Sequence, residues 1–293
     1  GSVRDRRERV AVSATEHPSV AGIRERSGQV DVLAVDADGR VEACELDRLG
    51  ASTAVASVMW VNNETGVIND VGAVCDAAHR VGAWAHTDAV QAVGHLPVDF
   101  AASGADLLSL TAHKLGGPVG IGALIRRRGI TLAPTGFGGG QEAKLRSGTV
   151  AVALAVGFAA ATRRAVAAQA QETARLAELR ERLLAGIGAI PQVRNNSVAP
   201  ASPAIVNLTF SGTRADDLLL LLDAAGIDAS TGSACTAGLH QPSEVLQAMG
   251  RSRADAGASL RFSFGWSTTA DDIDRLVAVL PGAVERARLA AAG

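Results

Sequence analysis

Short apolar runs alternate with helix-like stretches along the first half of this chain, and this alternation restricts the fold more than any other feature. Strand-like runs rich in valine, alanine and leucine lie at residues 10–13, 30–35, 53–61, 83–87, 106–111 and 120–126. Helix-like stretches lie among them, near residues 18–26, 70–81 and 89–93. Because parallel strands need crossover connections, this order predicts an α/β domain built on a mostly parallel sheet.

The composition changes after residue 150. Alanine, leucine, arginine and glutamate dominate residues 150–190 without a proline, which predicts one long helix or a broken pair. The rest of the chain predicts a compact α+β unit, with a strand at 204–210, a helix at 214–225, a strand that ends at the loop containing residue 235, a strand at 260–264 and a closing helix from 271. We therefore expect a large domain over 1–165 and a smaller one over 166–293.

The charge of the chain gives no reason to expect nucleic acid or a membrane as a partner. The 28 basic and 30 acidic residues leave a formal net charge of -2, and neither sign forms a long block. No apolar stretch approaches the ~18 residues that span a bilayer, and the first residues lack the layout of a signal peptide. We expect a cytoplasmic protein.

The three cysteines are Cys44, Cys75 and Cys235. They are few, odd in number and without Cys-x-x-Cys spacing, so we expect neither a disulfide framework nor a metal site. Cys235 lies among glycine, serine, alanine and threonine, a composition typical of a loop, and we expect Cys44 and Cys75 to be structural.

Asp88 and Lys114 each follow an apolar, strand-like run, so both should emerge at the carboxyl edge of one sheet, where α/β folds bind ligands. A lysine that forms an imine must be partly desolvated, and pyridoxal phosphate needs a carboxylate that keeps its ring nitrogen protonated. The pair fits these two roles. Taken alone, such a pair is more typical of a helix cap and a solvated loop lysine.

Eight motifs, taken in order, resemble the cysteine desulfurases of the NifS/IscS type, which are fold-type I pyridoxal phosphate enzymes related to class V aminotransferases. They lie at residues 15–17, 61–66, 86–91, 111–114, 138–142, 146–149, 231–236 and 260–263. The resemblance runs over nearly the whole chain. It implies an α/β fold with a mostly parallel, seven-stranded-type sheet, incomplete at the N-terminus, and a smaller C-terminal α+β domain.

The resemblance assigns cofactor roles to residues at the start of the chain and along the sheet. Lys114 would hold the cofactor, Asp88 would bind its ring nitrogen, and His17 would stack on its ring. Asn63 and Gln91 would donate hydrogen bonds to its phenolic oxygen.

Three further residues would bind the phosphate. Thr111 and His113 precede the lysine and match the hydroxyl and imidazole that contact it. Thr149 matches a hydroxyl that is donated to the phosphate of a neighbouring subunit, which implies a homodimer.

The resemblance also assigns the chemistry with L-cysteine as substrate. Arg261 would bind the substrate carboxylate, and Asn63 is also assigned to the substrate site. Cys235 would accept the sulfur as a persulfide for a sulfur-acceptor or scaffold protein. Lys114 would move the proton of the substrate α-carbon. Either His17 or Lys114 would assist deprotonation of the substrate thiol, and the sequence does not decide between them.

Members of the family have an additional N-terminal segment with a phosphate-binding loop at a helix start, and we expect this chain to lack it and to bind the cofactor weakly. Two alternatives remain open. One is a related lyase or aminotransferase, such as a selenocysteine lyase or a dedicated thiolation enzyme. The other is a truncated, non-catalytic partner subunit. The acceptor and the pathway, iron–sulfur cluster assembly among them, are not decided by the sequence.

Overall fold

The computed structural model describes residues 7–25, 29–232 and 241–292. The chain divides into two compact units. Unit 1 comprises residues 1–34, 41–60 and 69–168, and unit 2 comprises residues 35–40, 61–68 and 169–293. Two short segments from the first half of the chain therefore belong to unit 2, whereas we expected two contiguous domains. The boundary between residues 165 and 166 stays a prediction.

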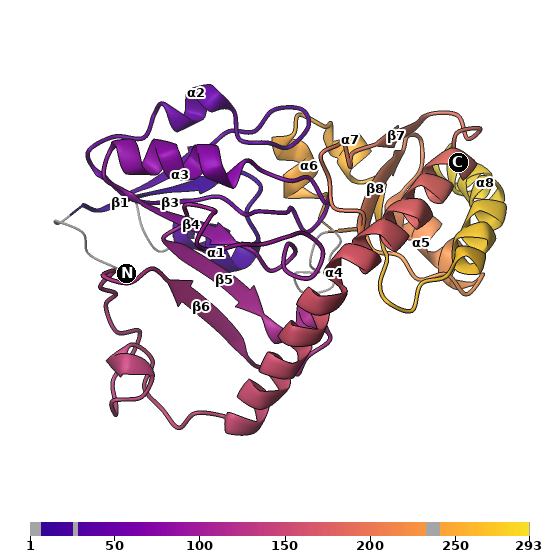
Figure 1. The fold of residues 1–293 in the computed structure, drawn as a ribbon. Coiled ribbons are helices and arrows are strands. Elements are labelled where there is room, and N and C mark those ends of the chain that lie inside the picture. The colour runs from indigo at the N-terminus through magenta and orange to yellow at the C-terminus, as the bar shows by residue number, and fades with distance from the viewer. Residues whose placement is uncertain (1–6, 26–28, 233–240, 293) are drawn as a thin grey trace. The chain divides into compact units, whose positions relative to one another are not determined.

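Unit 1 is built on a six-stranded sheet in the order β2-β1-β3-β4-β5-β6 (Figure 1). Its strands are β1 (Arg9–Ser13), β2 (Val30–Leu33), β3 (Thr53–Ser57), β4 (Trp84–Asp88), β5 (Leu107–Thr111) and β6 (Gly122–Arg126). The first five strands pair in parallel, and β6 pairs antiparallel with β5. The predicted mostly parallel sheet is confirmed, with six strands in the described part of the chain.

Helices α2 (Ala43–Leu46) and α3 (Val71–Arg80) cover one face of this sheet (Figure 1). In α3, the Asp70 side chain accepts a hydrogen bond from the Ala73 amide and caps the helix start. Val71, Val74 and Ala78 recur at helical spacing and are buried with alanines and leucines of the strands. Small residues on both sides let the helix lie close to the sheet.

Shorter helical segments join the strands of unit 1. They are α1 (Pro18–Ala21), η1 (Gly22–Glu25), η2 (Ala112–Leu115) and η3 (Glu142–Lys144). The helix predicted at residues 89–93 is wrong. Those residues form a single hydrogen-bonded turn, from the Val93 amide to the Ala89 carbonyl, and the left-handed Gly94 (φ 83°) ends it.

Unit 2 contains a three-stranded antiparallel sheet in the order β7-β8-β9. Its elements are β7 (Val193–Asn195), β8 (Ile205–Phe210), α5 (Ala215–Asp223), α6 (Glu244–Ala248), α7 (Arg253–Ala256), β9 (Ser259–Ser263) and α8 (Ala270–Ala292). Its core combines β8 and β9 with apolar residues of α5, α8 and the second half of α4 (Val152–Gly186).

The sequence predicts either one long helix or two helices over residues 150–190. The structure has one continuous helix there, α4. The strand predicted before the loop of residue 235 is reduced to an isolated bridge between Ser230 and Arg261. The left-handed Gly226 (φ 73°) ends the turn that follows α5, four residues before that bridge.

Candidate active site

Polar residues gather at the carboxyl ends of the parallel strands of unit 1. Glu16 and His17 follow β1, Asp88 is the last residue of β4, and Thr111 is the last residue of β5. Strands β1, β3, β4 and β5 are parallel neighbours, so their carboxyl ends lie on the same edge of the sheet. That edge is the usual ligand site of an α/β fold.

Asp88 is a buried carboxylate at this edge, with 6% of its surface exposed. Its Oδ1 accepts a hydrogen bond from the Val90 amide at 2.9 Å. Burial raises the pKa of Asp88, and the nearby His17 acts in the opposite direction. A buried carboxylate of this kind is stabilised by a cationic partner, which is what the ring nitrogen of pyridoxal phosphate offers when it is protonated.

Glu16 is a second buried carboxyl near Asp88, and the sequence reasoning gave it no role although it lies in the first motif. Its Oε1 accepts a hydrogen bond from the Met59 amide at 2.5 Å, and its buried Oε2 has no partner among the described residues. The pKa of Glu16 is raised to about 8, chiefly by burial, and the negative charge of Asp88 acts in the same direction. A neutral Glu16 is therefore the favoured charge state of this carboxyl at neutral pH.

His86 was also missed as an individual residue. It lies two residues before Asp88 on β4, so the two side chains share a face of the sheet. Its Nδ1 is 2.7 Å from Ser57 Oγ on β3, and its Nε2 is 2.9 Å from Ser109 Oγ on β5. Burial lowers the pKa of His86 to about 4, so the ring is neutral and links three strands.

The structure brings two predicted phosphate ligands together. Thr111 Oγ1 donates to the Ile121 carbonyl at 3.1 Å and lies 2.9 Å from His113 Nδ1. Because the single hydroxyl hydrogen goes to the carbonyl, His113 donates to Thr111. Lys114 follows in the 3-10 turn η2 and is exposed. We expected a partly desolvated lysine, whereas Lys114 is exposed in this structure, and its role as the cofactor lysine stays a prediction.

Three other predicted cofactor residues belong to unit 1. His17 is exposed and caps α1, with its Nδ1 accepting from the Ser19 amide at 3.2 Å. Gln91 lies half-buried in the turn after β4. Thr149 is exposed in the stretch that leads into α4. Its role stays a prediction.

Asn63 and Arg261, the predicted substrate residues, contact each other in unit 2. Arg261 Nη1 on β9 donates to the Asn63 carbonyl at 3.0 Å. Asn63 Oδ1 and Arg261 Nε are buried and have no hydrogen-bond partner in the described chain. Unpaired buried polar atoms are costly in a folded protein, so a pair of them at one place indicates a ligand that completes their hydrogen bonds.

Cys235, the predicted sulfur acceptor, lies outside the described residues. Of the other two cysteines, Cys75 is buried on α3 and Cys44 is exposed at the start of α2. Burial raises the pKa of Cys75 to about 11, so its thiolate is scarce at neutral pH and it is a poor candidate for nucleophilic chemistry.

The donor set fits pyridoxal phosphate in chemical type. A primary amine, a buried carboxylate and a hydroxyl–imidazole pair follow neighbouring strands at one sheet edge, as Lys114, Asp88 and Thr111 with His113. The unpaired Oδ1 of Asn63 belongs to an amide that can donate through its nitrogen to the phenolic oxygen. These are the group types that the cofactor requires.

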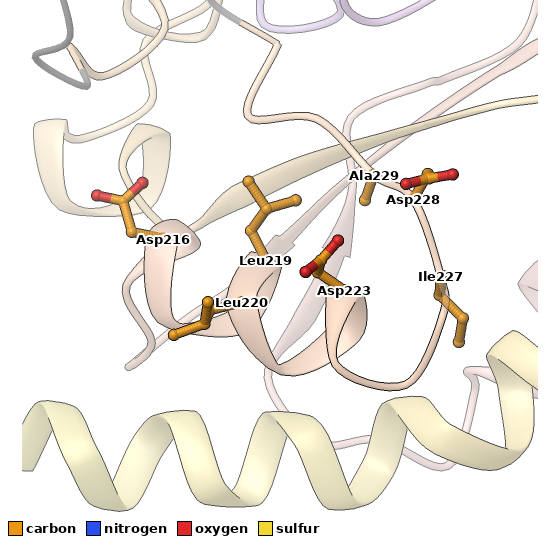
Figure 2. A pocket seen from close by; sticks show the side chains of 7 residues that line it. All are labelled: Asp216, Leu219, Leu220, Asp223, Ile227, Asp228 and Ala229. Atoms are coloured by element: carbon orange, nitrogen blue, oxygen red, sulfur yellow. The ribbon is translucent and has the colours of Figure 1, made fainter.

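A separate depression of about 300 Å³ lies on unit 2 around α5. Figure 2 shows the three carboxylates and the apolar side chains that line it. None of the predicted site residues is among them. Within the described ranges, no group of three or more histidine, cysteine or acidic side chains is arranged to hold a metal ion, and no helix is long and apolar enough to cross a membrane.

Comparison with known proteins places this arrangement in context. The family model of class-V aminotransferases matches residues 2–276. An IscS-like cysteine desulfurase of Mycobacterium tuberculosis is 46% identical over 301 residues, an alignment that covers 98% of this chain and 77% of that protein. Among solved structures, a NifS-like protein from Rickettsia africae has a TM-score of 0.87 at 26% identity and covers 95% of this chain and 76% of its own. The structure of SspA in complex with cysteine has a TM-score of 0.71 at 30% identity, and the match covers 89% of this chain and 74% of the SspA chain.

Proposed function

The chain belongs to the class-V aminotransferase family and, within it, to the cysteine desulfurases, and from this premise we propose that it uses pyridoxal phosphate to convert L-cysteine to L-alanine and leaves the sulfur on Cys235. The observation that carries the proposal is the buried Asp88 carboxyl on β4, beside the strand that leads into Lys114. A relative of similar fold has been solved with cysteine bound, which supports the substrate.

When bound, pyridoxal phosphate supplies an electron sink that stabilises negative charge on the substrate α-carbon. Asp88 keeps the ring nitrogen protonated, and Lys114 holds the cofactor and then moves the proton of the α-carbon. Thr111 and His113 bind the phosphate, while His17 stacks on the ring. Asp88 and Thr111 are the last residues of β4 and β5, and His113 and Lys114 follow Thr111 directly in η2.

Asn63, Gln91 and Arg261 complete the binding roles. The amides of Asn63 and Gln91 donate to the phenolic oxygen. The Arg261 guanidinium binds the substrate carboxylate in a bidentate manner, and this carboxylate supplies the acceptor that the buried Nε of Arg261 lacks in the described chain.

The overall reaction balances without an external oxidant or reductant. L-Cysteine and the thiol of Cys235 give L-alanine and the persulfide of Cys235. The carbon–sulfur bond of the substrate breaks, and a sulfur–sulfur bond forms at Cys235 Sγ. The two electrons that the transferred sulfur loses reduce the substrate β-carbon, which also takes up one of the two thiol protons. The persulfide then passes to an acceptor protein.

The active protein is a homodimer in this proposal, with Thr149 serving the phosphate of the neighbouring subunit. Exposed apolar side chains on β6 and the first half of α4 support an interface on unit 1. Leu124 is 51% exposed, Val156 is 63% exposed and Val166 is 57% exposed. Apolar patches of this kind mark association surfaces in soluble proteins.

Single-turnover chemistry tests the function. The purified chain is loaded with pyridoxal phosphate and mixed with L-cysteine, and both alanine and the persulfide at each cysteine are quantified by mass spectrometry. We expect equal amounts of alanine and Cys235 persulfide. Both should disappear in Cys235→Ser and persist in the matched variant Cys44→Ser. Formation of 3-mercaptopyruvate would instead favour an aminotransferase, and alanine with no persulfide at Cys235 would favour a different sulfur acceptor.

A further inference from the structure

Glu64 is a buried acid in unit 2 that the proposed chemistry does not use. It is 7% exposed, and its carboxyl lies among residues that are distant in sequence. Ser243 Oγ donates to Glu64 Oε2 at 2.5 Å. The Glu64 carbonyl accepts from Asn207 Nδ2 on β8 at 3.3 Å. An acid this deeply buried is retained only when it is hydrogen-bonded or close to a positive charge.

Gly232 lies against the same carboxyl oxygen. A Cβ added to Gly232 would stand 3.0 Å from Glu64 Oε2, and its φ of 84° already favours glycine. The Gly232 amide donates to Ser230 Oγ at 3.1 Å, and Ser230 forms the backbone bridge to Arg261 on β9. The chain is thus fixed between β9 and Glu64 immediately before residue 233.

Ser243 fixes the chain after residue 240 in a similar manner. Its hydroxyl accepts from the Leu246 amide at 3.1 Å, which caps the start of α6, and donates to Glu64. Glu64 Oε2 therefore accepts a hydrogen bond from Ser243 and occupies the space that a side chain at residue 232 would need, and these two residues lie before and after the stretch that contains Cys235.

Arg261 connects this cluster to the substrate residues. It donates to the carbonyl of Asn63, the residue before Glu64, and the charges of Glu64 and Arg261 attract each other. Glu64 therefore follows Asn63 in the chain and is close enough to Arg261 for their charges to interact. Its carboxyl group is hydrogen-bonded to Ser243 and leaves room only for glycine at residue 232.

We propose that Glu64 is a positioning residue for sulfur transfer: it fixes Gly232 and Ser243 and so determines how readily Cys235 takes up sulfur, without contributing to cofactor binding. This inference rests on the proposed function, in which Cys235 is the residue that accepts the sulfur. If Glu64 had only a structural role, its substitution would weaken cofactor binding and persulfide formation together.

The test compares Glu64→Ala and Ser243→Ala with the double variant, using Glu178→Ala on the exposed side of α4 as the matched control. The rate of Cys235 persulfide formation and the dissociation constant of pyridoxal phosphate are measured for each. We expect persulfide formation to fall at least about tenfold in Glu64→Ala, with cofactor binding changed less than twofold. The double variant should be no slower than the slower single variant, because both remove the same contact.

Alkylation of the thiols provides a readout that needs neither cofactor nor substrate. We expect the alkylation rate of Cys235 to change at least about threefold in Glu64→Ala, while that of the exposed Cys44 is constant. Should Glu64→Ala fail to fold, Ser243→Ala and Ser243→Thr replace it. Loss of the hydroxyl should then slow persulfide formation, and the threonine should restore it.

Additive effects, an unchanged persulfide rate, or a loss of cofactor binding in proportion to the loss of rate would each overturn the positioning role. These results differ from a failure of the proposed function. In that case the unmodified chain forms no persulfide at Cys235, and both proposals fall together.

Discussion

Glu16 accepts a hydrogen bond from the backbone amide of Met59, with 2.5 Å between oxygen and nitrogen. This contact joins the segment after β1 to the segment after β3, beside Asp88. It holds a carboxyl group whose second oxygen has no partner in the described chain. The proton on that carboxyl has consequences for stability.

The stability of the protein should fall as Glu16 ionises. Burial raises its pKa from 4.5 to about 8, so between these pH values the folded state keeps a proton that the unfolded state has lost. The stabilisation is complete below pH 4.5 and is lost as the pH rises through 8, at up to about 1.4 kcal/mol per pH unit. Glu16→Gln keeps an oxygen acceptor for Met59 and removes the titration. In urea unfolding at pH 5, 6.5 and 8, the unfolding free energy of the variant should increase relative to that of the unmodified chain as the pH rises. A constant difference between the two proteins would contradict a raised pKa.

His86 should have the opposite dependence on pH. Burial lowers its pKa from 6.5 to about 4, so its contribution is complete above pH 6.5 and is lost as the pH falls toward 4. At neutral pH, His86→Phe should cost about 1–3 kcal/mol, because Ser57 and Ser109 lose their buried partner. The cost should shrink on acidification. Chemical unfolding at pH 7 and pH 5 measures it, and an equal cost at both pH values would show that the imidazole does not titrate as expected.

Lys114 should be the residue that binds the cofactor covalently. The chain contains only one other lysine, Lys144, which is also exposed and serves as a matched control. After borohydride reduction of the loaded protein, the cofactor mass should appear on the peptide of Lys114. Lys114→Ala should lower turnover at least about 1,000-fold, and its unfolding free energy should change by less than about 0.5 kcal/mol because the side chain is exposed. Trapping of the cofactor on Lys144 would refute the assignment.

Arg261 should determine the affinity for the substrate carboxylate. Loss of a bidentate, charge-assisted pair removes about 1.5–3 kcal/mol, so Arg261→Lys should lower kcat/KM roughly 10- to 150-fold. Most of the change should lie in KM, with the dissociation constant of the cofactor little altered. Arg253→Lys, an exposed position on α7, provides the control. Steady-state kinetics with L-cysteine decide, and an unchanged KM would place the carboxylate elsewhere.

Much of unit 1 could be predicted because its strands are local apolar runs bounded by turns, and five of them needed little adjustment. The short helix expected at 89–93 failed because five residues are too few for helical periodicity to outweigh a turn that ends at Gly94. The roles of Glu16 and Glu64 could not be read from the chain. Each depends on a partner 43 or 179 residues away, Met59 and Ser243, and only the tertiary fold brings them together.

The location of some predicted site residues could be read from the sequence, whereas the surroundings of others could not. Asp88 and Thr111 are the last residues of strands, so the alternation of apolar runs with helix-like stretches was enough to predict their place at the ligand edge of the sheet. Sequence could not indicate that Lys114 is exposed, because the exposure of a residue in η2 depends on what packs around that turn. Nor could it indicate that Asn63 belongs with Arg261 in unit 2, since the strand before it belongs to unit 1.

Residues 61–68 belong to unit 2 although the residues on both sides of them in the chain belong to unit 1, and this limits where the protein can be cut into fragments or joined to a relative. A fragment that starts at residue 169 would lack Asn63 and Glu64, so Asn207, Ser243 and Arg261 would each lose a hydrogen-bond partner. A chimera that joined residues 169–293 of this chain to the first half of a relative would pair these three residues with a foreign loop. Residues 61–68 therefore need to be exchanged together with the C-terminal half when the protein is recombined.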